Sequence, residues 1–336
     1  MLLAVETSCD DTALAVLDDW RVIHSEVAGQ DAHHRHGGVV PEIASRLHLD
    51  VLPGMADRAL DSSEISLSEI DALAATAGPG LIGSLLVGLS WTKSLAWAMD
   101  KPFLAVNHLA AHLFSCYRGP GSIVWPAVAL VASGGHTCTF LMGSPSDLRL
   151  LGSTRDDAAG ETFDKIAKLL GLGFPGGPGI ERLAEKGDPD SIDLPSPLGD
   201  PSDPDFSFSG LKTAARLRWE AGVSPEDLCA SLQRVITDLL AEKLLYQAEL
   251  HQADSVVAGG GVLANRRLRE LLEELCARRG LNLYLPPPAM TTDNAIMVGR
   301  AALTALHHKP ESKSPISVNA FARWTGEELS TVVGLD

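Results

Sequence analysis

The sequence lacks paired cysteines. Its five cysteines are scattered along 336 residues, and no two of them form a Cys-x-x-Cys pair. This spacing argues against a disulfide scaffold and favours a reduced, cytosolic chain. The first residues enter an apolar run at once, without the basic and then apolar pattern of a signal peptide. We therefore expect a cytoplasmic protein.

An uninterrupted membrane-spanning run is also missing. The one apolar stretch of sufficient length, Leu81 to Met99, contains Thr92 and Lys93 and follows a glycine-rich turn. Polar and charged groups are costly inside a bilayer, so we expect a buried helix here and no membrane partner.

Aromatic residues are few, at 5%, whereas glycine is abundant, with 31 residues. Glycine permits tight strand-to-helix turns and close backbone packing, which are typical of α/β folds. A chain of 336 residues is longer than one hydrophobic core usually supports, so we expect two packed lobes.

The chain has no excess of positive charge. Its formal net charge is −16, and its arginines form small islands such as 266–269 and 278–279. A protein that grips nucleic acid unaided usually has a basic face. Nucleic-acid binding would therefore need a local patch or a partner protein.

Two segments of the chain resemble each other. Leu2–Leu17 and Ala127–Met142 each consist of an apolar run, a small polar turn and a second apolar run. Each predicts a β-hairpin whose turn exposes backbone N–H groups. The repetition indicates two lobes built on a common plan, although chance alone could also produce such a pair.

Apolar periodicity predicts the other main elements. We expect strands at 70–77, 103–106 and 255–258, helices at 81–99, 162–170, 228–253 and 263–275, and a long loop at 187–209. Loops of that length in compact domains are usually functional lids or disordered segments.

His108 and His112 are the sharpest chemical signal. Their spacing places both imidazoles on one helix face, which is half of a metal site, although such pairs are also common without a metal. The protease motif His-Glu-x-x-His has the same spacing, but Leu109 stands where its glutamate would be. Asp293 precedes an apolar helix and could be a third ligand or simply the cap of that helix.

Three glycine-rich turns could approach a nucleotide. Gly78–Gly83 matches Gly-x-Gly-x-x-Gly, but Asp100 precedes the next strand instead of ending it, which disfavours a Rossmann site. Ser133–Thr137 and Gly259–Gly261 predict backbone nests for a phosphate, or turns that only need glycine for their shape.

Acidic residues gather in two places. The segment Asp156–Asp164 enters a helix, where the helix dipole favours negative charge, and Asp164 could also bind a ribose hydroxyl. Asp10 and Asp11 lie in the first hairpin turn, where they could hold a metal-bound water or a substrate amine, or could face solvent.

Together these segments resemble the TsaD family, also called Gcp, the tRNA N6-adenosine threonylcarbamoyltransferases. The resemblance covers almost the whole chain in order. Its motifs include Val5–Asp10, Gly37–Glu42, Val106–His112, Ser133–Thr137, Asp156–Asp164, Pro175–Pro178, Phe208–Lys212, Gly259–Asn265 and Thr292–Ala295.

The resemblance implies an α/β fold of the actin, Hsp70 and sugar kinase (ASKHA) class, with a ligand cleft between duplicated lobes. We expect an N-terminal lobe at 1–124, a C-terminal lobe carrying the nucleotide turns at 125–293, and a helix and tail at 294–336 that pack back across the lobes.

The resemblance also implies which residues form the site. His108, His112 and Asp293 would bind one divalent metal, commonly described as iron or zinc, and Asp10 or Asp11 would accept a proton. Relatives usually have Glu at the second of these two positions, and often have Asp where this chain has Glu181. The adenylate part of the substrate would contact Val131, Ala132, Ser133, Gly134, Gly135, Asp164, Gly177, Glu181 and Asn265.

The implied reaction transfers threonylcarbamoyl from threonylcarbamoyl-AMP to the N6 amine of the adenosine 3′-adjacent to the anticodon. The site would hold this substrate, or ATP or AMP. Family members bind tRNA with TsaB-like and TsaE-like partner proteins, which suits an acidic chain. There are three rival functions. A small-molecule kinase of the same fold would not need paired histidines, a metalloprotease would need the glutamate base that is missing here, and a non-catalytic subunit would be expected to lose the metal triad.

Overall fold

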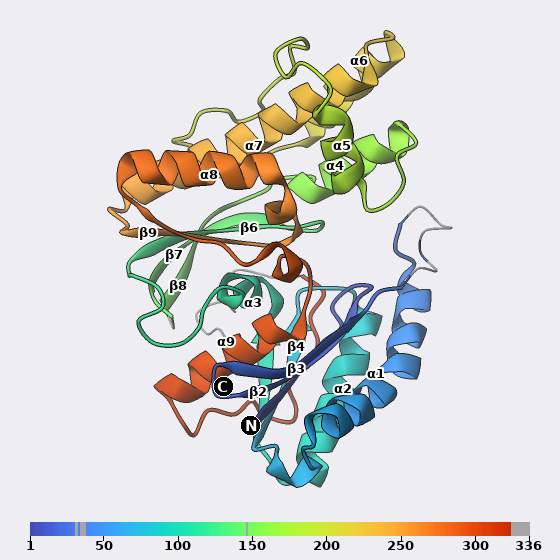
Figure 1. Ribbon diagram of the computed structural model, residues 1–336, viewed down its shortest axis with the longest axis vertical. Helices are drawn as coiled ribbons and strands as arrows, with labels where there is room; N and C mark the ends of the chain where they lie inside the picture. The colour runs from blue at the N-terminus through green and yellow to red at the C-terminus, as the bar shows by residue number, and fades with distance from the viewer. Residues whose placement is uncertain (31–32, 34–37, 146, 324–336) are drawn as a thin grey trace. The chain divides into compact units, whose positions relative to one another are not determined.

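A computed structural model describes residues 1–30, 33, 38–145 and 147–323. The chain forms two compact units (Figure 1). The first comprises Met1–Ser122, Pro145–Leu148 and the described residues from Asp293 onward, and the second comprises Ile123–Ser144 and Arg149–Thr292. The helix that follows Asp293 therefore belongs to the first unit.

The strands are β1 (Leu2–Glu6), β2 (Thr12–Asp18), β3 (Arg21–Ala28), β4 (Ala72–Gly78), β5 (Phe103–Asn107), β6 (Ala127–Ala132), β7 (Thr137–Ser144), β8 (Asp147–Ser153), β9 (Ser255–Gly259) and β10 (Asn282–Tyr284). The α-helices are α1 (Pro41–Ser63), α2 (Ile82–Ala98), α3 (His108–Phe114), α4 (Ala159–Leu169), α5 (Gly176–Ala184), α6 (Ser209–Glu220), α7 (Pro225–Leu250), α8 (Arg266–Arg279) and α9 (Ala295–His308). Short 3-10 helices are η2 (Leu67–Glu69), η3 (Gly261–Ala264) and η4 (Pro288–Met290).

The two sheets have the same topology. The first has the order β3-β2-β1-β4-β5, in which β1 is antiparallel to β2 and parallel to β4. The second has the order β8-β7-β6-β9-β10, in which β6 is antiparallel to β7 and parallel to β9. Counted in chain order, both sheets therefore read third, second, first, fourth and fifth strand. The predicted duplication is confirmed.

Both predicted hairpins are also confirmed. In the first, Leu2 of β1 pairs with Leu17 of β2, and in the second, Ala127 of β6 pairs with Met142 of β7. The hairpins form because each apolar run can be buried on both faces, which explains why the strands read as nearly continuous apolar segments.

The first sheet has helices on both faces (Figure 1). Leu3 and Val5 of β1 share one hydrophobic cluster with residues of α1 and α2. On the opposite face Ala4 lies against Gly299 of α9. In the second unit Val128 and Leu130 of β6 belong to a single cluster with α4, α5, α6, α7 and α8. None of the described helices combines the length and apolar character that crossing a bilayer requires.

Some elements differ from the expected ones. The helix expected at 263–275 begins three residues later, because η3 occupies Gly261–Ala264 and the side chain of Asn265 caps α8 by accepting a hydrogen bond from Leu268 N. α5 begins within the Pro-Gly-Gly-Pro segment, where apolar periodicity gives no helix signal. The long loop expected after residue 187 is confirmed, and the buried ammonium of Lys243 on α7 donates to the carbonyl oxygens of Asp200 and Asp203 within it.

The packing of α2 against Thr7, which follows β1, and against Ser45 of α1 predicts different effects for two glycine substitutions. A Cβ at Gly88 would lie 2.3 Å from Thr7 Oγ1, which is buried and donates to Ser84 O, whereas a Cβ at Gly83 would meet Ser45 at 3.4 Å or more. We expect Gly88→Ala to destabilise the protein by about 1–3 kcal/mol because it overpacks the interface. Gly83→Ala should be neutral or stabilise by up to ~1 kcal/mol, because alanine favours the helix. Chemical denaturation of both variants tests this, and equal stabilities would contradict it.

Candidate metal centre and nucleotide turns

The two histidines are positioned by the junction between β5 and α3. Asn107 ends the strand, and its side chain accepts hydrogen bonds from the backbone N–H groups of Leu109 and Ala110, at 2.9 and 3.2 Å. This cap starts α3 at His108 and places His112 one turn further along. His108 is 5% exposed and His112 is 1% exposed, so both residues are buried.

Asp293 reaches the histidines from the start of α9. The cap of α9 is Asn294, whose side chain accepts a hydrogen bond from Met297 N. The interpretation of Asp293 as the cap of this helix is therefore wrong. Its Oδ1 lies 3.6 Å from His108 Nε2 and 3.3 Å from His112 Nε2.

The donor set suits a divalent metal. One ligand atom from each of His108, His112 and Asp293 can be chosen so that all three lie within 4.8 Å of one another. Among the described residues, neither ring nitrogen of His112 has a hydrogen-bond partner, although both are buried. A buried imidazole without such a partner is costly, and coordination of a metal by two imidazoles and a carboxylate would satisfy one of its nitrogens.

Glu6 and Ser8 complete the surroundings of His108. His108 Nδ1 lies 3.0 Å from Glu6 Oε2 and 3.2 Å from Ser8 Oγ. Burial alone would lower the pKa of His108, but the negative charges of Glu6 and Asp293 outweigh burial and raise that pKa to about 9. Burial also opposes ionisation of Glu6, but His108 outweighs it and lowers the pKa of Glu6.

Local sequence patterns assigned no role to Glu6 or Ser8. Glu6 is separated from His108 by 102 positions, so only the pairing of β1 with β4 and of β4 with β5 brings them together. The sequence held one signal, because Glu6 ends an otherwise apolar strand, and the structure shows that it is 0% exposed. Charged residues are almost never fully buried without a partner.

Asp10 and Asp11 lie in the turn between β1 and β2, in the same unit as the triad. Burial, followed by the charges of Asp293, Asp10 and Glu6, raises the pKa of Asp11 to about 7. A carboxylate that titrates near neutrality is suited to accept a proton. His48 of α1 holds this turn, because its Nε2 lies 2.9 Å from Cys9 O and its Nδ1 lies 2.7 Å from Thr12 Oγ1.

In the second unit, the predicted nucleotide turns pack against one another. Ser133 N donates to His136 O at 2.8 Å, and Gly160 N at the start of α4 donates to Ser133 O at 3.1 Å. A Cβ at Gly160 would lie 2.5 Å from Ser133 O, and one at Gly260 would lie 2.3 Å from Ala132 O. These two glycines are therefore required by close backbone contacts.

Three other glycines are not required by the fold. Gly134, Gly135 and Gly177 do not have a left-handed φ, and a Cβ at any of them would meet no described atom within 4 Å. The space beside these three glycines is therefore not filled by other described residues, and a backbone nest at Gly134 and Gly135 stays a prediction. Val131 and Ala132 are fully buried at the end of β6, directly before this turn.

The other predicted substrate contacts are already part of a network between helices. Asp164 Oδ1 accepts a hydrogen bond from Gly176 N at 2.7 Å, and Asn265 Nδ2 donates to Gln233 Oε1 at 2.8 Å. Glu181 Oε1 accepts from Arg266 N at 2.7 Å, at the first turn of α8. A nucleotide would share the carboxylate oxygens of Asp164 and Glu181 with backbone amides, and substrate contact by Asp164, Asn265 and Glu181 stays a prediction.

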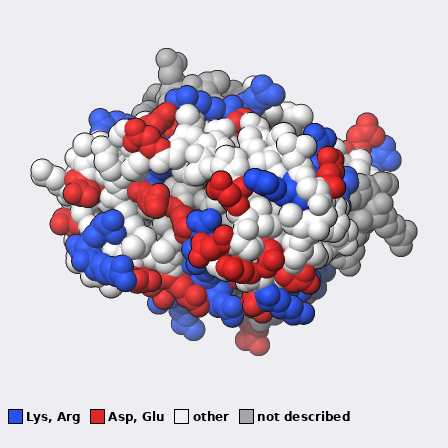
Figure 2. Space-filling model, turned by 90° about the horizontal axis from the view of Figure 1, so that it is seen from above, with Lys and Arg blue, Asp and Glu red and all other residues white. Residues whose placement is uncertain are grey.

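The surface around α6, α7 and α8 carries both signs of charge. Figure 2 shows Lys and Arg interspersed with Asp and Glu over this face. Arg266, Arg267 and Arg278 of α8 each pair with a carboxylate, from Glu185, Asp238 and Glu274 respectively. The arginine islands are therefore largely neutralised by their neighbours.

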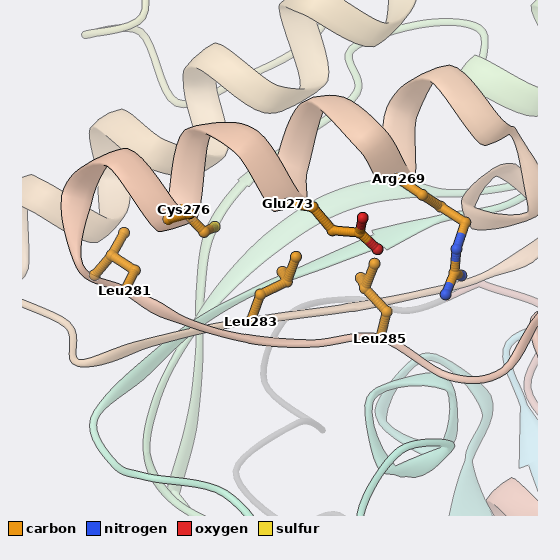
Figure 3. A pocket seen from close by; sticks show the side chains of 7 residues that line it. Arg269, Glu273, Cys276, Leu281, Leu283 and Leu285 are labelled. Atoms are coloured by element: carbon orange, nitrogen blue, oxygen red, sulfur yellow. The ribbon is translucent and has the colours of Figure 1, made fainter.

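An open groove of about 400 Å³ lies between α8 and the chain at 281–285 (Figure 3). Its lining comes from Leu281, Leu283 and Leu285 on one side and from helix residues that include Arg269 and Glu273 on the other. None of the predicted site residues lines it, so it is separate from the candidate site.

Two units of the same sheet topology give this chain the two-lobed fold of the actin-like ASKHA class. HypF of T. kodakarensis has this fold, with a TM-score of 0.66 and 16% identity, and the match covers 91% of this chain but only 48% of HypF. Component A of the (R)-2-hydroxyglutaryl-CoA dehydratase of Acidaminococcus fermentans matches with a TM-score of 0.54 and 14% identity over 91% of this chain and 98% of that one.

Sequence comparison identifies the family within this class. A family model described as TsaD, tRNA N6-adenosine threonylcarbamoyltransferase, matches residues 21–300. The transferase of that name from Syntrophomonas wolfei is 43% identical over 96% of both chains, and the one from Desulforapulum autotrophicum is 46% identical over 89% of this chain and 92% of the relative. The chain belongs to this family.

The raised pKa of Asp11 predicts a pH-dependent effect of Asp11→Asn on stability. The pKa rises from 3.8 to about 7 on folding, so the ionised side chain destabilises the fold increasingly as the pH rises through this window. In metal-free protein, we expect Asp11→Asn to raise the Tm, with a gain that is negligible below pH 4, grows between pH 4 and 7 and then levels off. Thermal denaturation in the presence of a chelator measures this, and a gain that does not depend on pH would contradict it.

Proposed function

We propose that this chain transfers the threonylcarbamoyl group from threonylcarbamoyl-AMP to the N6 amine of the adenosine 3′-adjacent to the anticodon, in tRNAs that read ANN codons. The observation that carries this proposal is the family match over residues 21–300. The intact set of His108, His112 and Asp293 favours a catalytic member over a non-catalytic paralogue.

The reaction is an acyl transfer that needs no nucleophilic side chain. The amine nitrogen attacks the carbamoyl carbon, the bond from that carbon to the phosphate oxygen breaks, and AMP leaves with the electron pair. The amine must lose one proton, and Asp11, with its pKa near 7, is suited to accept it. Asp10 is the alternative acceptor.

His108, His112 and Asp293 would hold the metal, which we propose to be Fe²⁺, with Zn²⁺ as the alternative. Two imidazoles and one carboxylate that leave open positions are the ligand set of non-haem Fe(II) sites. When bound, a divalent ion would supply Lewis acidity that polarises the carbonyl or stabilises the departing phosphate.

The second lobe would bind the adenylate. The turn of Ser133, Gly134 and Gly135 would hold the phosphate. The backbone amides of Gly134 and Gly135 are suited to this role, because a Cβ at either glycine would meet no described atom within 4 Å, whereas Ser133 N already donates to His136 O. Asp164 and Asn265, each held by a hydrogen bond to a neighbouring helix, would contact the ribose or base without reorganising.

The partners we propose are tRNA, a TsaB-like paralogue and a TsaE-like ATPase. The net charge of −16 and the pairing of the α8 arginines with carboxylates leave little free positive charge to attract a phosphate backbone. A partner protein would supply the missing basic surface.

Loss of a triad ligand should abolish the reaction. We expect His112→Ala and Asp293→Ala to reduce threonylcarbamoyladenosine in tRNA by at least about 100-fold while the protein stays folded, because each removes one of three ligands. His251→Ala, at the end of α7, is the matched control and should be fully active. Nucleoside analysis of tRNA from a reconstituted reaction measures the product, and full modification by both triad variants would exclude the proposed metal site.

The charge distribution predicts that partners are required. With threonylcarbamoyl-AMP and tRNA supplied, the purified chain alone should modify tRNA poorly, and addition of the TsaB-like and TsaE-like proteins should raise the rate. Efficient turnover by the single chain at physiological salt would show that its own surface suffices.

A further inference from the structure

The two histidines of α3 are held in different ways. His108 Nδ1 contacts a carboxylate at 3.0 Å and a hydroxyl at 3.2 Å, whereas neither nitrogen of His112 has a hydrogen-bond partner among the described residues. The two rings are otherwise close, with centroids 4.6 Å apart. The difference therefore arises from Glu6 and not from the position of α3.

The carboxylate of Glu6 is itself firmly placed. It is 0% exposed, and it accepts hydrogen bonds from Thr76 Oγ1 on β4, at 2.6 Å, and from Ser8 N. Burying a carboxylate costs several kcal/mol unless it is paired and hydrogen-bonded. Among the described residues, His108 is the one histidine whose ring contacts this carboxylate. The fold therefore keeps a costly buried carboxylate next to Nδ1 of a proposed metal ligand.

We propose that Glu6 is the positioning residue of the metal centre. Its carboxylate can only accept a hydrogen bond, so it selects the tautomer of His108 that carries the proton on Nδ1. That tautomer leaves the lone pair of Nε2, the nitrogen that faces Asp293, for the metal. The carboxylate also increases the basicity of the ring and restrains its rotation, as partners of metal-bound histidines generally do. This inference rests on the proposed metal site but not on the proposed tRNA reaction.

Two features separate this role from direct coordination. Glu6 Oε2 approaches His108 at Nδ1, while Asp293 approaches the same ring at Nε2, so the two carboxylates lie at different edges of the imidazole. Only His108, His112 and Asp293 form a ligand cluster among the described residues. Glu6 therefore acts through His108.

A double-mutant cycle on Co²⁺ affinity tests the proposal, with the visible spectrum of Co²⁺ as the readout. We expect Glu6→Gln in the full-length protein to weaken Co²⁺ binding about 10–100-fold, because the neutral amide no longer selects the tautomer or increases the basicity. In a His108→Ala background the same substitution should have no further effect. In a His112→Ala background it should keep its full effect, because His108 is still present.

Several outcomes would overturn the proposal. One is a folded Glu6→Gln protein that binds Co²⁺ within about twofold of the wild type, and another is an equal loss in both histidine backgrounds, which would indicate a merely structural role. If Glu6→Gln does not fold, Thr76→Val replaces it, because this change keeps the carboxylate and removes one of its donors. Thr76→Val should then weaken Co²⁺ binding several-fold unless His108 is absent, and unchanged affinity would reject the proposal.

The tRNA assay separates the two levels of inference. A protein that shows the expected Co²⁺ cycle but forms no threonylcarbamoyladenosine with its partners would retain the role of Glu6 and lose the proposed function. A protein that modifies tRNA but whose Co²⁺ affinity does not depend on Glu6 would retain the proposed function and lose the role of Glu6.

Discussion

The first unit is organised around one polar cluster in which the buried Glu6 and His108 meet the partly exposed Asp293. These residues come from the end of β1, the first turn of α3 and the start of α9. Each would be costly to bury alone, and together they compensate one another. The strand order β1-β4-β5 and the packing of α9 on the same sheet are what bring them together. Burial keeps water away from the contact between Glu6 and His108 and so makes it strong.

The two sheets have the same topology, but their equivalent turns carry side chains of different chemistry. The turn between β1 and β2 carries Asp10 and Asp11, and the equivalent turn between β6 and β7 carries Gly134 and Gly135. Both turns lie at the same topological position, at the end of a central strand paired in parallel on its other side. An acidic turn suits a proton acceptor near a cation, whereas a glycine turn suits the approach of an anion to backbone amides.

The glycines of the second unit have two distinct functions. Gly160 and Gly260 let neighbouring backbones approach so closely that any side chain would collide. At Gly134, Gly135 and Gly177 an added Cβ would meet no described atom within 4 Å, so packing within the fold does not require glycine at these positions. The sequence shows all five as glycine and cannot separate the two groups, because the distinction depends on contacts between segments far apart in the chain.

The sequence by itself determined the local features of this protein. Apolar runs predicted both hairpins and most helices, and the four-residue spacing of His108 and His112 placed both on one face of α3, because these features depend on neighbours within a few residues. Only the tertiary structure decided that Glu6 meets His108 at Nδ1, that Asn294 and not Asp293 caps α9, and that Glu181 binds the start of α8. These contacts join residues through sheet pairing and helix packing, and the burial that makes them strong does not exist until the chain has folded.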